Sequence, residues 1–213
     1  MRLFSHELEK RYYSKEWPTK VKPYLHLEPY LRCWMNPDEV FGGKKILDIG
    51  AGECEYSRLI VDKYNPKEII ACDLFEERMQ LAKTENKNPK LKFVTGDVFD
   101  LPFETNSFDV VFGSLVLHQL PNLGDVVGEV NRVLKPKGVY VGFEPNPFNM
   151  IILFRHFFKK HSSNQYLFWP WLAKDAFNTA DFDVKICYFY AKVPWVKNQF
   201  LGTCIGIIAN LND

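Results

Sequence analysis

The stretch KILDIGAG, residues 45–52, decides the fold class of this chain. Residues 45–49 form a short, mainly apolar run of the kind that suits a strand buried on both faces. The small residues Gly50-Ala51-Gly52 follow as a turn, and a helical segment is predicted around Ser57 to Tyr64. A buried strand, a glycine turn and a helix in this order are typical of the first unit of an open α/β sheet.

The alternation of strands and helices continues along the chain. Helices are predicted at 76–83 and 123–134. The segment Lys135-Pro136-Lys137-Gly138 predicts the end of the helix at 123–134, because proline and glycine are stop signals for a helix. The further strands are predicted at 68–73, 92–94, 108–113, 139–144, 182–190 and 203–211. The pattern predicts an α/β domain with a Rossmann-like, doubly wound, seven-stranded and mostly parallel sheet that carries helices on both faces.

Composition and charge exclude several classes of protein. The chain has 213 residues, of which 46% are hydrophobic and 25% charged, and these are ordinary values for a globular domain. The net charge of +1 argues against a nucleic-acid-binding protein, since such proteins usually carry a basic surplus. The longest uncharged apolar stretch, 200–211, is shorter than the roughly 20 residues of a membrane helix. The first residues meet charge too early for a signal peptide.

Cysteine usage gives an expectation about the compartment. The five cysteines are odd in number, scattered, and free of any Cys-x-x-Cys pair. This pattern predicts reduced thiols in a cytoplasmic protein, with neither a disulfide framework nor a metal site.

The composition of the sequence distinguishes a leading segment from one main domain. Residues 1–41 are predicted to be a helical lid segment, interrupted by four prolines. Residues 42–213 are predicted to be the ligand-binding domain. Within it, residues 148–200 hold 15 of the 33 aromatic residues of the chain, against about 8 for an even spread. This aromatic-rich region is the candidate binding region for a second ligand.

The first turn and the next two strand ends predict a nucleoside site. Glycines 50 and 52 let the main chain approach a ligand without a Cβ atom in the way. Asp73 follows Gly52 by 21 residues, at the end of the second strand, where a carboxylate can accept hydrogen bonds from both ribose hydroxyls. Asp97, after the third strand, is placed for the amino group of an adenine.

Two cofactors share this ribose-binding logic, and the turn distinguishes them. A dinucleotide site typically has the motif Gly-x-Gly-x-x-Gly, which binds the pyrophosphate at the N-terminus of the following helix. The chain instead continues after Gly52 with Glu53-Cys54-Glu55, and two carboxylates beside a pyrophosphate would repel it. S-adenosylmethionine has no phosphate but carries an ammonium and a sulfonium, for which acidic neighbours are favourable. The acidic residues therefore favour S-adenosylmethionine.

Four longer motifs then support a family resemblance. They read LDIGAGECEYS, ACDLFEERMQLA, GDVFDLPFETNSFDVVFGSLVLHQL and EVNRVLKPKGVYVGFEPNPFN. In order and spacing they resemble the class I S-adenosylmethionine-dependent methyltransferases, and most closely the small-molecule branch that includes the ubiquinone and menaquinone methyltransferases. The resemblance covers about 44–149. Cys54 departs from the family pattern, which usually has a third glycine there, so a slightly altered turn is expected.

The resemblance implies a role for each residue of the cofactor site. Asp48 would anchor the methionine ammonium through the turn, and an N-terminal aromatic residue, Tyr12 or Tyr13, would cover the cofactor. The remaining implied contacts are Gly50, Ala51 and Gly52 for the methionine portion, Asp73 for the ribose, Leu74 for the adenine face, Asp97 and Val98 for the adenine edge, and Ser114 and Leu115 for the sulfonium.

Methyl transfer from a sulfonium is an in-line displacement, so the protein mainly has to align the reactants and exclude water. A base is needed only when the acceptor arrives protonated. By the resemblance, His118 faces the acceptor pocket and would suit this role; the alternative is that it only shapes the pocket through a main-chain hydrogen bond. Glu144, at the end of the fifth strand, would orient an acceptor hydroxyl or amine, or else bind a loop.

The segment 148–161 has two interpretations. Its apolar side chains recur at helical spacing, and Arg155, His156, Lys159, Lys160 and His161 occupy the other side. Such a helix could contact an anionic membrane surface or a lipid-like acceptor, or it could pack on the sheet like an ordinary helix. The aromatic excess would also suit a homodimer contact.

The sequence as a whole predicts an enzyme that transfers methyl from S-adenosylmethionine to a small hydrophobic, aromatic or lipid-like acceptor. The alternatives are a non-catalytic methyltransferase-like partner subunit, an NAD-binding oxidoreductase, and an aminopropyl transferase, which would want additional acids for a polyamine.

Overall fold

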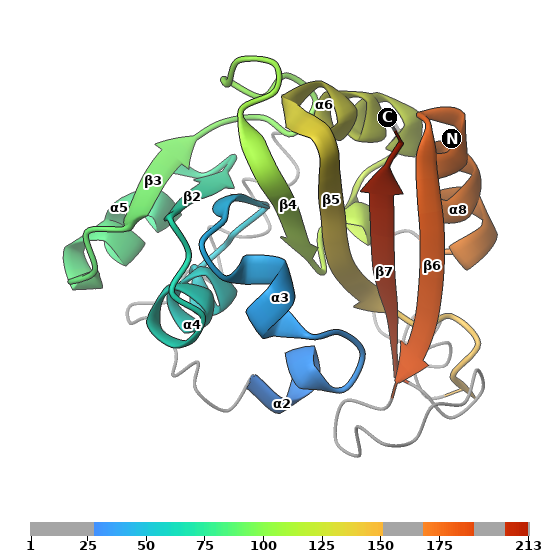
Figure 1. Cartoon of the computed structure of the whole chain (residues 1–213), viewed down its shortest axis with the longest axis horizontal. Helices are drawn as coiled ribbons and strands as arrows, with labels where there is room; N and C mark the ends of the chain where they lie inside the picture. Colours follow the sequence, from blue (N-terminus) through green and yellow to red (C-terminus); the bar gives the residue numbers. More distant parts are fainter. Residues whose placement is uncertain (1–27, 151–167, 190–202, 213) are drawn as a thin grey trace.

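Seven strands form one sheet in the order β3-β2-β1-β4-β5-β7-β6 (Figure 1). The computed structural model describes residues 28–150, 168–189 and 203–212. Strand β7 is antiparallel to β5 and β6, and the other neighbouring pairs are parallel. The predicted seven-stranded, mostly parallel sheet is therefore confirmed. The strands are β1 (Lys45–Ile49), β2 (Glu68–Asp73), β3 (Leu91–Thr95), β4 (Phe108–Ser114), β5 (Leu134–Pro145), β6 (Phe182–Phe189) and β7 (Cys204–Leu211).

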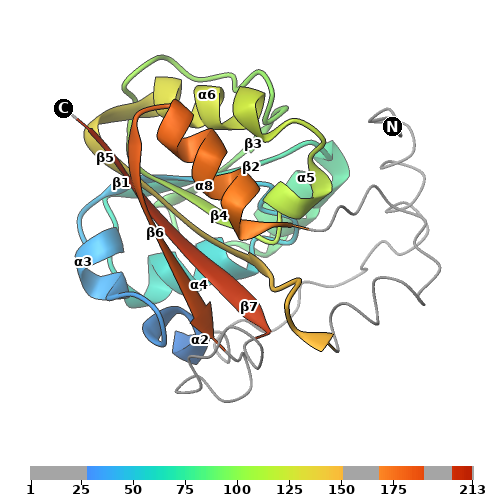
Figure 2. The same cartoon turned by 90° about the vertical axis from the view of Figure 1, so that its right-hand side faces the viewer.

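Helices cover both faces of the sheet, as predicted (Figure 2). Helices α2, α3 and α4 lie on one face, and α6 and α8 lie on the other. Buried residues of α5 belong to the same core cluster as those of α4. The bounds are α2 (Glu28–Arg32), α3 (Pro37–Phe41), α4 (Glu55–Lys63), α5 (Glu76–Glu85), the 3-10 turn η2 (Leu117–Gln119), α6 (Leu123–Val133) and α8 (Pro170–Thr179).

The side-chain pattern of β1 explains why the sheet needs both layers. Ile46 contributes to the core on the α4 face, while Leu47 and Ile49 contribute to the core on the α6 face. All three are completely buried. A strand that buries alternate side chains on opposite faces has to be apolar along its length, and this explains the apolar run in the sequence.

The end of helix α6 differs from the prediction. Leu134 was expected as the last residue of that helix, but it is the first residue of β5, which runs on to Pro145. The pairing of β4 with β5 shifts register between Phe108 and Val110, and Lys137 has a φ of 62°. Lys135–Gly138 is therefore an irregularity within a strand, since its proline and glycine bend the strand instead of forming a separate loop.

Residues 28–41 belong to the domain core. Leu31 and Phe41 are completely buried, and the ring of Trp34 stacks on Phe189 of β6 at 6.0 Å. The described part of the predicted lid segment is therefore a layer packed on the sheet. Residues 1–27 of the predicted lid segment, with Tyr12 and Tyr13, lie outside the described residues, as does the segment 151–161.

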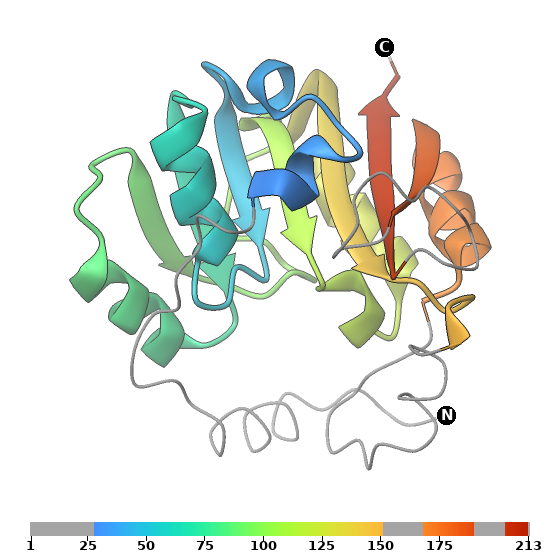
Figure 3. The ribbon, with the colours of Figure 1, turned by 90° about the horizontal axis from the view of Figure 1, so that it is seen from below.

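The carboxyl ends of the central strands meet at one edge of the sheet. Figure 3 shows the arrowheads of β1, β4 and β5 reaching the same edge, with β7 pointing the opposite way. Loops that leave parallel strands at this edge are where open α/β sheets bind ligands. Within the described part of the chain, no helix combines the length and apolar content needed to cross a membrane.

Candidate functional site

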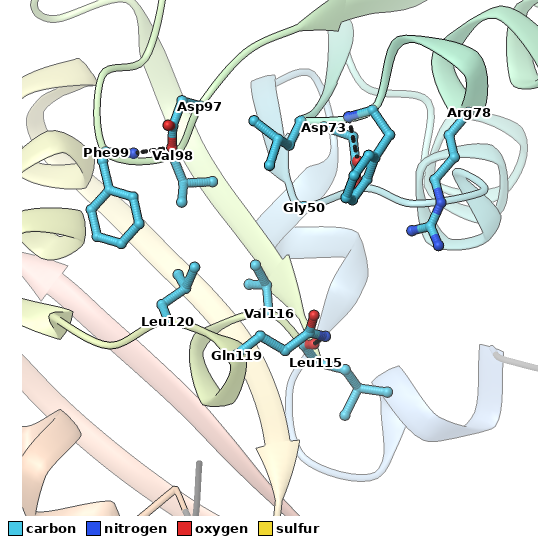
Figure 4. A pocket seen from close by; sticks show the side chains of 12 residues that line it. Gly50, Asp73, Arg78, Asp97, Val98, Phe99, Leu115, Val116, Gln119 and Leu120 are labelled. Carbon is cyan, nitrogen blue, oxygen red and sulfur yellow. Dashed lines mark hydrogen bonds between the residues drawn. The ribbon is translucent and has the colours of Figure 1, made fainter. Parts of the chain in front are cut away.

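A cleft opens at the carboxyl ends of β1, β2 and β4, at the edge where the predicted ligand site lies (Figure 4). We call it the nucleoside cleft; it encloses about 620 Å³, open mouth included. Six of the predicted contact residues line it, and they come from four separate loops. The lining residues are Gly50, Asp73, Leu74, Phe75, Arg78, Asp97, Val98, Phe99, Leu115, Val116, Gln119 and Leu120.

Asp73 connects two of these loops. Its Oδ2 accepts a hydrogen bond from the main-chain nitrogen of Gly52 at 2.8 Å, and its Oδ1 accepts one from Phe75 at 3.0 Å. The residue is 5% exposed, and burial raises the pKa of its carboxyl, while the Arg78 guanidinium lowers it. The carboxylate is thus held rigidly at the cleft wall, between the glycine turn and the start of α5.

The turn after β1 needs glycine at its first position. Gly50 has a φ of 61°, and a Cβ atom there would lie 2.4 Å from Cγ2 of Val116. Cys54, where the sequence departs from the family pattern, also adopts a left-handed conformation, with a φ of 57°. It immediately precedes α4 and is completely buried. The turn therefore keeps the geometry of a glycine-rich loop with a cysteine at its third position.

Asp48 lies beneath the turn and not in the cleft wall. It is 2% exposed, its Oδ2 accepts a hydrogen bond from the hydroxyl of Ser57, and Oδ1 has no partner among the described residues. Burial raises the pKa of this carboxyl to about 7, and the Ser57 hydroxyl works against that rise. Asp48 therefore pins the start of α4 to β1. The predicted role of Asp48 in anchoring the methionine ammonium through the turn stays a prediction.

Asp97 lies across the cleft from Asp73 (Figure 4). Its Oδ1 accepts a hydrogen bond from the main-chain nitrogen of Phe99 at 3.0 Å, which fixes the loop after β3. Val98 lines the cleft beside it. Of the other predicted contacts, Ala51, Gly52 and Ser114 do not line the cleft; Ala51 and Ser114 are adjacent in sequence to lining residues, and Gly52 lies two residues after Gly50.

Arg78 is the charged residue of the cleft lining that the sequence analysis did not predict. It projects from the first turns of α5 into the cleft (Figure 4), and its guanidinium lies 5.3 Å from the ring centre of Phe75. Asp73 ends β2 and α5 begins at Glu76, so position 78 could have been placed near the cleft from spacing alone. A cation here offsets part of the negative charge that Asp73 and Asp97 bring to the cleft.

Glu144 binds the loop after β4, which is one of the two roles that the sequence analysis left open. It is completely buried, and its Oε1 accepts hydrogen bonds from the main-chain nitrogens of Val116 at 3.1 Å and Leu117 at 2.8 Å. Its Oε2 accepts one from the nitrogen of His118 at 3.3 Å and lies 2.7 Å from His118 Nδ1. Glu144 therefore positions the loop and the histidine, and a contact between Glu144 and an acceptor stays a prediction.

His118 lines a second cleft on the other side of η2, which we call the α6–α8 cleft. Its volume is about 1480 Å³, open mouth included. Phe168 and Trp169, from the predicted aromatic-rich region, form part of its wall, and the ring of Trp169 stacks on Trp171 at 4.7 Å. The lining residues are Leu117, His118, Leu120, Pro121, Asn122, Leu123, Gly124, Phe168, Trp169, Leu172, Asp175, Ala176, Thr179 and Ala180.

Metal chemistry has no evident ligand set in the described parts of the chain. Within residues 28–150, 168–189 and 203–212, no three His, Cys, Asp or Glu side chains are grouped as a metal ion would require. The groups that the described residues offer to a ligand in the two clefts are therefore carboxylates, one guanidinium, one imidazole and apolar side chains.

Comparison with known proteins gives consistent matches. A family model described as a methyltransferase domain matches residues 47–142. A demethylmenaquinone methyltransferase of Staphylococcus carnosus is 30% identical over 194 residues, which cover 84% of this chain and 78% of the relative. A phthiotriol/phenolphthiotriol dimycocerosates methyltransferase of Mycobacterium tuberculosis is 32% identical over 123 residues, which cover 57% of this chain. The match spans only 45% of the length of that mycobacterial relative.

Solved structures agree on the fold. An S-adenosylmethionine-dependent methyltransferase from Mesorhizobium loti superimposes with a TM-score of 0.71 at 17% identity, covering 87% of this chain and 97% of that one. At this level of identity the likeness concerns the fold alone.

Proposed function

This chain belongs to the class I S-adenosylmethionine-dependent methyltransferases, and on that premise we propose that it transfers a methyl group from S-adenosylmethionine to a small apolar acceptor. The observation that carries the proposal is the nucleoside cleft, in which Asp73 and Asp97 come from neighbouring strand ends and a glycine turn forms the floor.

The residues present suit this cofactor. Asp73 would accept hydrogen bonds from the ribose hydroxyls, and Asp97 would accept one from the adenine amino group, with Val98 against the ring edge. The absence of a Cβ atom at Gly50 lets the side chain of Val116 pack against the turn at the cleft wall. When bound, the cofactor supplies a methyl group activated by a positively charged sulfur. The two carboxylates of the cleft favour a cationic ligand there.

The family membership does not favour the dinucleotide alternative. The turn lacks the third glycine of a pyrophosphate-binding loop, and Glu53 and Glu55 bring negative charge next to the start of α4. A phosphate at that helix end would meet those carboxylates. The non-catalytic alternative predicts cofactor binding without turnover, and this is one outcome of the test below.

An apolar acceptor is supported by the relatives and by the aromatic region. The two relatives described above are named for demethylmenaquinone and for phthiotriol and phenolphthiotriol dimycocerosates, acceptors with large apolar bodies. In this chain the α6–α8 cleft has leucine, phenylalanine and tryptophan in its wall, next to the nucleoside cleft. We extend to this protein only the class: an apolar acceptor with a nucleophilic group.

Two measurements test the proposal. Calorimetry with S-adenosylhomocysteine should give saturable binding with one site per chain, whereas NADH should not bind. Incubation with labelled S-adenosylmethionine and either demethylmenaquinol or a long-chain diol should transfer label to an organic extract. Binding of NADH in place of S-adenosylhomocysteine would overturn the proposal, and cofactor binding without label transfer would favour the non-catalytic partner subunit.

Location, membrane contact and self-association are further parts of the proposal. All five cysteines are free thiols, which suits a cytoplasmic enzyme. Met150, Trp171 and Leu172 are more than half exposed, which suits contact with a membrane surface near 148–161. Sedimentation with anionic vesicles at low salt and analytical ultracentrifugation of the protein alone would separate membrane binding from a homodimer.

A further inference from the structure

The loop between β3 and β4 forms one wall of the nucleoside cleft and is bonded to helix α6. Asp97, Val98 and Phe99 from this loop line the cleft. The next residues, 101–103, make hydrogen bonds to α6. Helix α6 itself contributes no residue to the lining of the nucleoside cleft. Its contacts with the loop therefore act on the cleft through the loop alone.

Two residues of α6, Glu129 and Arg132, hold the loop by its main chain, and we call this pair the α6 clamp. Oε2 of Glu129 accepts a hydrogen bond from the nitrogen of Leu101 at 2.8 Å. Nη2 of Arg132 donates to the carbonyl oxygen of Leu101 at 2.9 Å, and Nη1 donates to that of Phe103 at 2.6 Å. Nε of Arg132 also donates to Oε1 of Glu129 at 2.7 Å, and Nη2 donates to Oε2 at 2.7 Å. The planar guanidinium therefore binds one carboxylate and two carbonyl groups at once.

The α6 clamp lies one tight turn away from Asp97. The nitrogen of Asp100 donates to the carbonyl oxygen of Asp97 at 3.2 Å, and that of Phe99 donates to Oδ1 of Asp97 at 3.0 Å. Leu101, which the clamp holds, follows this turn directly and is 3% exposed. Because hydrogen bonds close the turn between them, fixing Leu101 also fixes the carboxylate of Asp97.

Pro102 makes a second connection between the clamped segment and Asp97. A Cβ atom on Gly96 would lie 2.8 Å from Cδ of Pro102, so the proline ring packs directly on the main chain of Gly96. Gly96 immediately precedes Asp97, and its nitrogen donates to the carbonyl oxygen of Asp73 at 3.0 Å. The clamped segment 101–103 therefore contacts the chain just before Asp97 as well as just after it.

On the basis of the proposed function, we propose that Glu129 and Arg132 are positioning residues for purine recognition, which hold Asp97 where it accepts a hydrogen bond from an adenine amino group. In hypoxanthine a carbonyl oxygen takes the place of that amino group. A carboxylate and a carbonyl oxygen both accept hydrogen bonds and cannot pair. A fixed Asp97 therefore rejects an inosine ligand, whereas a carboxylate on a loose loop can move away from the carbonyl oxygen. The α6 clamp thus determines how strongly the nucleoside cleft selects adenine over hypoxanthine.

Calorimetry with S-adenosylhomocysteine and S-inosylhomocysteine, which differ in the purine ring alone, measures this selectivity. The wild type should bind the adenosine probe about 30-fold or more tightly than the inosine probe, because the inosine probe leaves a buried acceptor unpaired. Arg132→Met keeps an apolar side chain but cannot donate, so the ratio of the two affinities should fall to about threefold or less. Arg132→Lys retains the charge with fewer donors and should give an intermediate ratio. Asp97→Asn, whose amide can donate to the carbonyl oxygen, should lower the ratio at least as far as Arg132→Met.

Two further variants separate positioning from a general loss of stability. Lys135→Met breaks the ion pair between Nζ of Lys135 and Oδ1 of Asp109, which are 2.7 Å apart, and leaves the loop after β3 untouched. Its affinity ratio should stay within about twofold of the wild type, because reduced stability alone weakens the binding of both probes equally. Glu129→Gln keeps an oxygen for the nitrogen of Leu101 but loses the charged pair with Arg132. It should lower the ratio and provides the test if Arg132→Met does not fold.

The outcomes distinguish the role of the α6 clamp from the proposed function. Failure of the wild type to bind S-adenosylhomocysteine would remove the proposed function and with it the role of the clamp. Equal affinities of the wild type for the two probes would overturn purine recognition by Asp97, and the clamp's role with it, while the cofactor assignment stands. A wild-type ratio in Arg132→Met and Glu129→Gln, with a lowered ratio in Asp97→Asn, would overturn the clamp alone.

Discussion

The main-chain nitrogen of Gly52 donates a hydrogen bond to Oδ2 of Asp73 at 2.8 Å, which joins the turn after β1 to the end of β2. One carboxylate therefore has two functions. It shapes the glycine turn from the side, and it presents its charge to the nucleoside cleft. The two strand ends are parallel neighbours, with Ile49 opposite Cys72, so the bond joins loops that the sheet already holds together.

Asp73→Ala should weaken binding of S-adenosylhomocysteine by about 1.5–3 kcal/mol, because it removes hydrogen bonds to a charged group. Calorimetry should therefore show a dissociation constant about 10 to 150 times higher. Asp73→Asn keeps an oxygen for the nitrogen of Gly52 or Phe75 and should lose less. Equal affinities in the wild type and Asp73→Ala would remove the ribose assignment.

Asp48 should make the stability of the protein depend on pH. Burial raises the pKa of its carboxyl from 3.8 to about 7. Between these values the folded chain keeps a proton that the unfolded chain has released, so stability falls as pH rises through this window and levels off above it. The slope is at most about 1.4 kcal/mol per pH unit. Urea unfolding at about pH 5 and about pH 7 should show this loss in the wild type.

Asp48→Asn is the control for that slope, since the amide does not titrate. Carboxyl groups far from Asp48 titrate equally in both proteins, so the difference between wild type and variant reports Asp48 together with its charge interaction with Asp73. The variant should show a stability that declines less between the two pH values, whatever its absolute stability. Parallel curves for the two proteins would contradict the raised pKa of Asp48.

Cys54 should be strained by its left-handed main chain, which a residue with a Cβ atom adopts at a cost. Both Cys54→Ala and Cys54→Gly lose the buried sulfur, but only glycine relieves the strain. We expect Cys54→Gly to be more stable than Cys54→Ala by about 0.5–1 kcal/mol in chemical denaturation. At Asp62, an exposed position within α4, the order should reverse, because glycine is the poorer helix former there. The same order at both positions would argue against strain at Cys54.

Tyr140 offers a stabilising substitution. It is completely buried on β5, its ring lies 4.8 Å from that of Phe177, and its hydroxyl has no hydrogen-bond partner among the described residues. Since an unsatisfied buried hydroxyl is unfavourable, Tyr140→Phe should raise the free energy of unfolding by about 1–2 kcal/mol. Tyr188→Phe, at a partly exposed position on β6, should change it by less than about 0.5 kcal/mol. A destabilised Tyr140→Phe would show that the hydroxyl is bonded in solution.

Local sequence patterns predicted most of the strands and several of the helices, because the apolar periodicity of a helix or strand extends over only a few residues. The bounds of β1 and β2 agree with the prediction, and the other predicted strands and helices in the described residues differ by a few residues at their ends. Helix α8 was not predicted, and the largest error at a predicted boundary lies at Leu134 and the four residues after it. A proline and a glycine usually end an element, but here pairing with β4 keeps the segment in the sheet as a bulge.

The cofactor side of the site was predictable for a topological reason. In a parallel sheet the residues just after each strand share one edge, so Gly50, Asp73 and Asp97 had to come close together. Arg78 was open to the same reasoning but carries no motif. Glu144 was placed at the right edge, yet its partners could not be predicted from its position, because they depend on how the loop after β4 folds back over the end of β5.

The sequence by itself determined the sheet, its layers and the edge at which ligands bind, because apolar periodicity and glycine turns act over a few residues. Only the tertiary structure decided which polar groups meet: Gly52 with Asp73, and the three loop nitrogens and the imidazole with Glu144. The partners of Glu144 precede it by 26 to 28 residues. Which of them a buried carboxylate contacts is set by the packing of whole strands and loops, since a buried charge takes the donors that packing brings within reach.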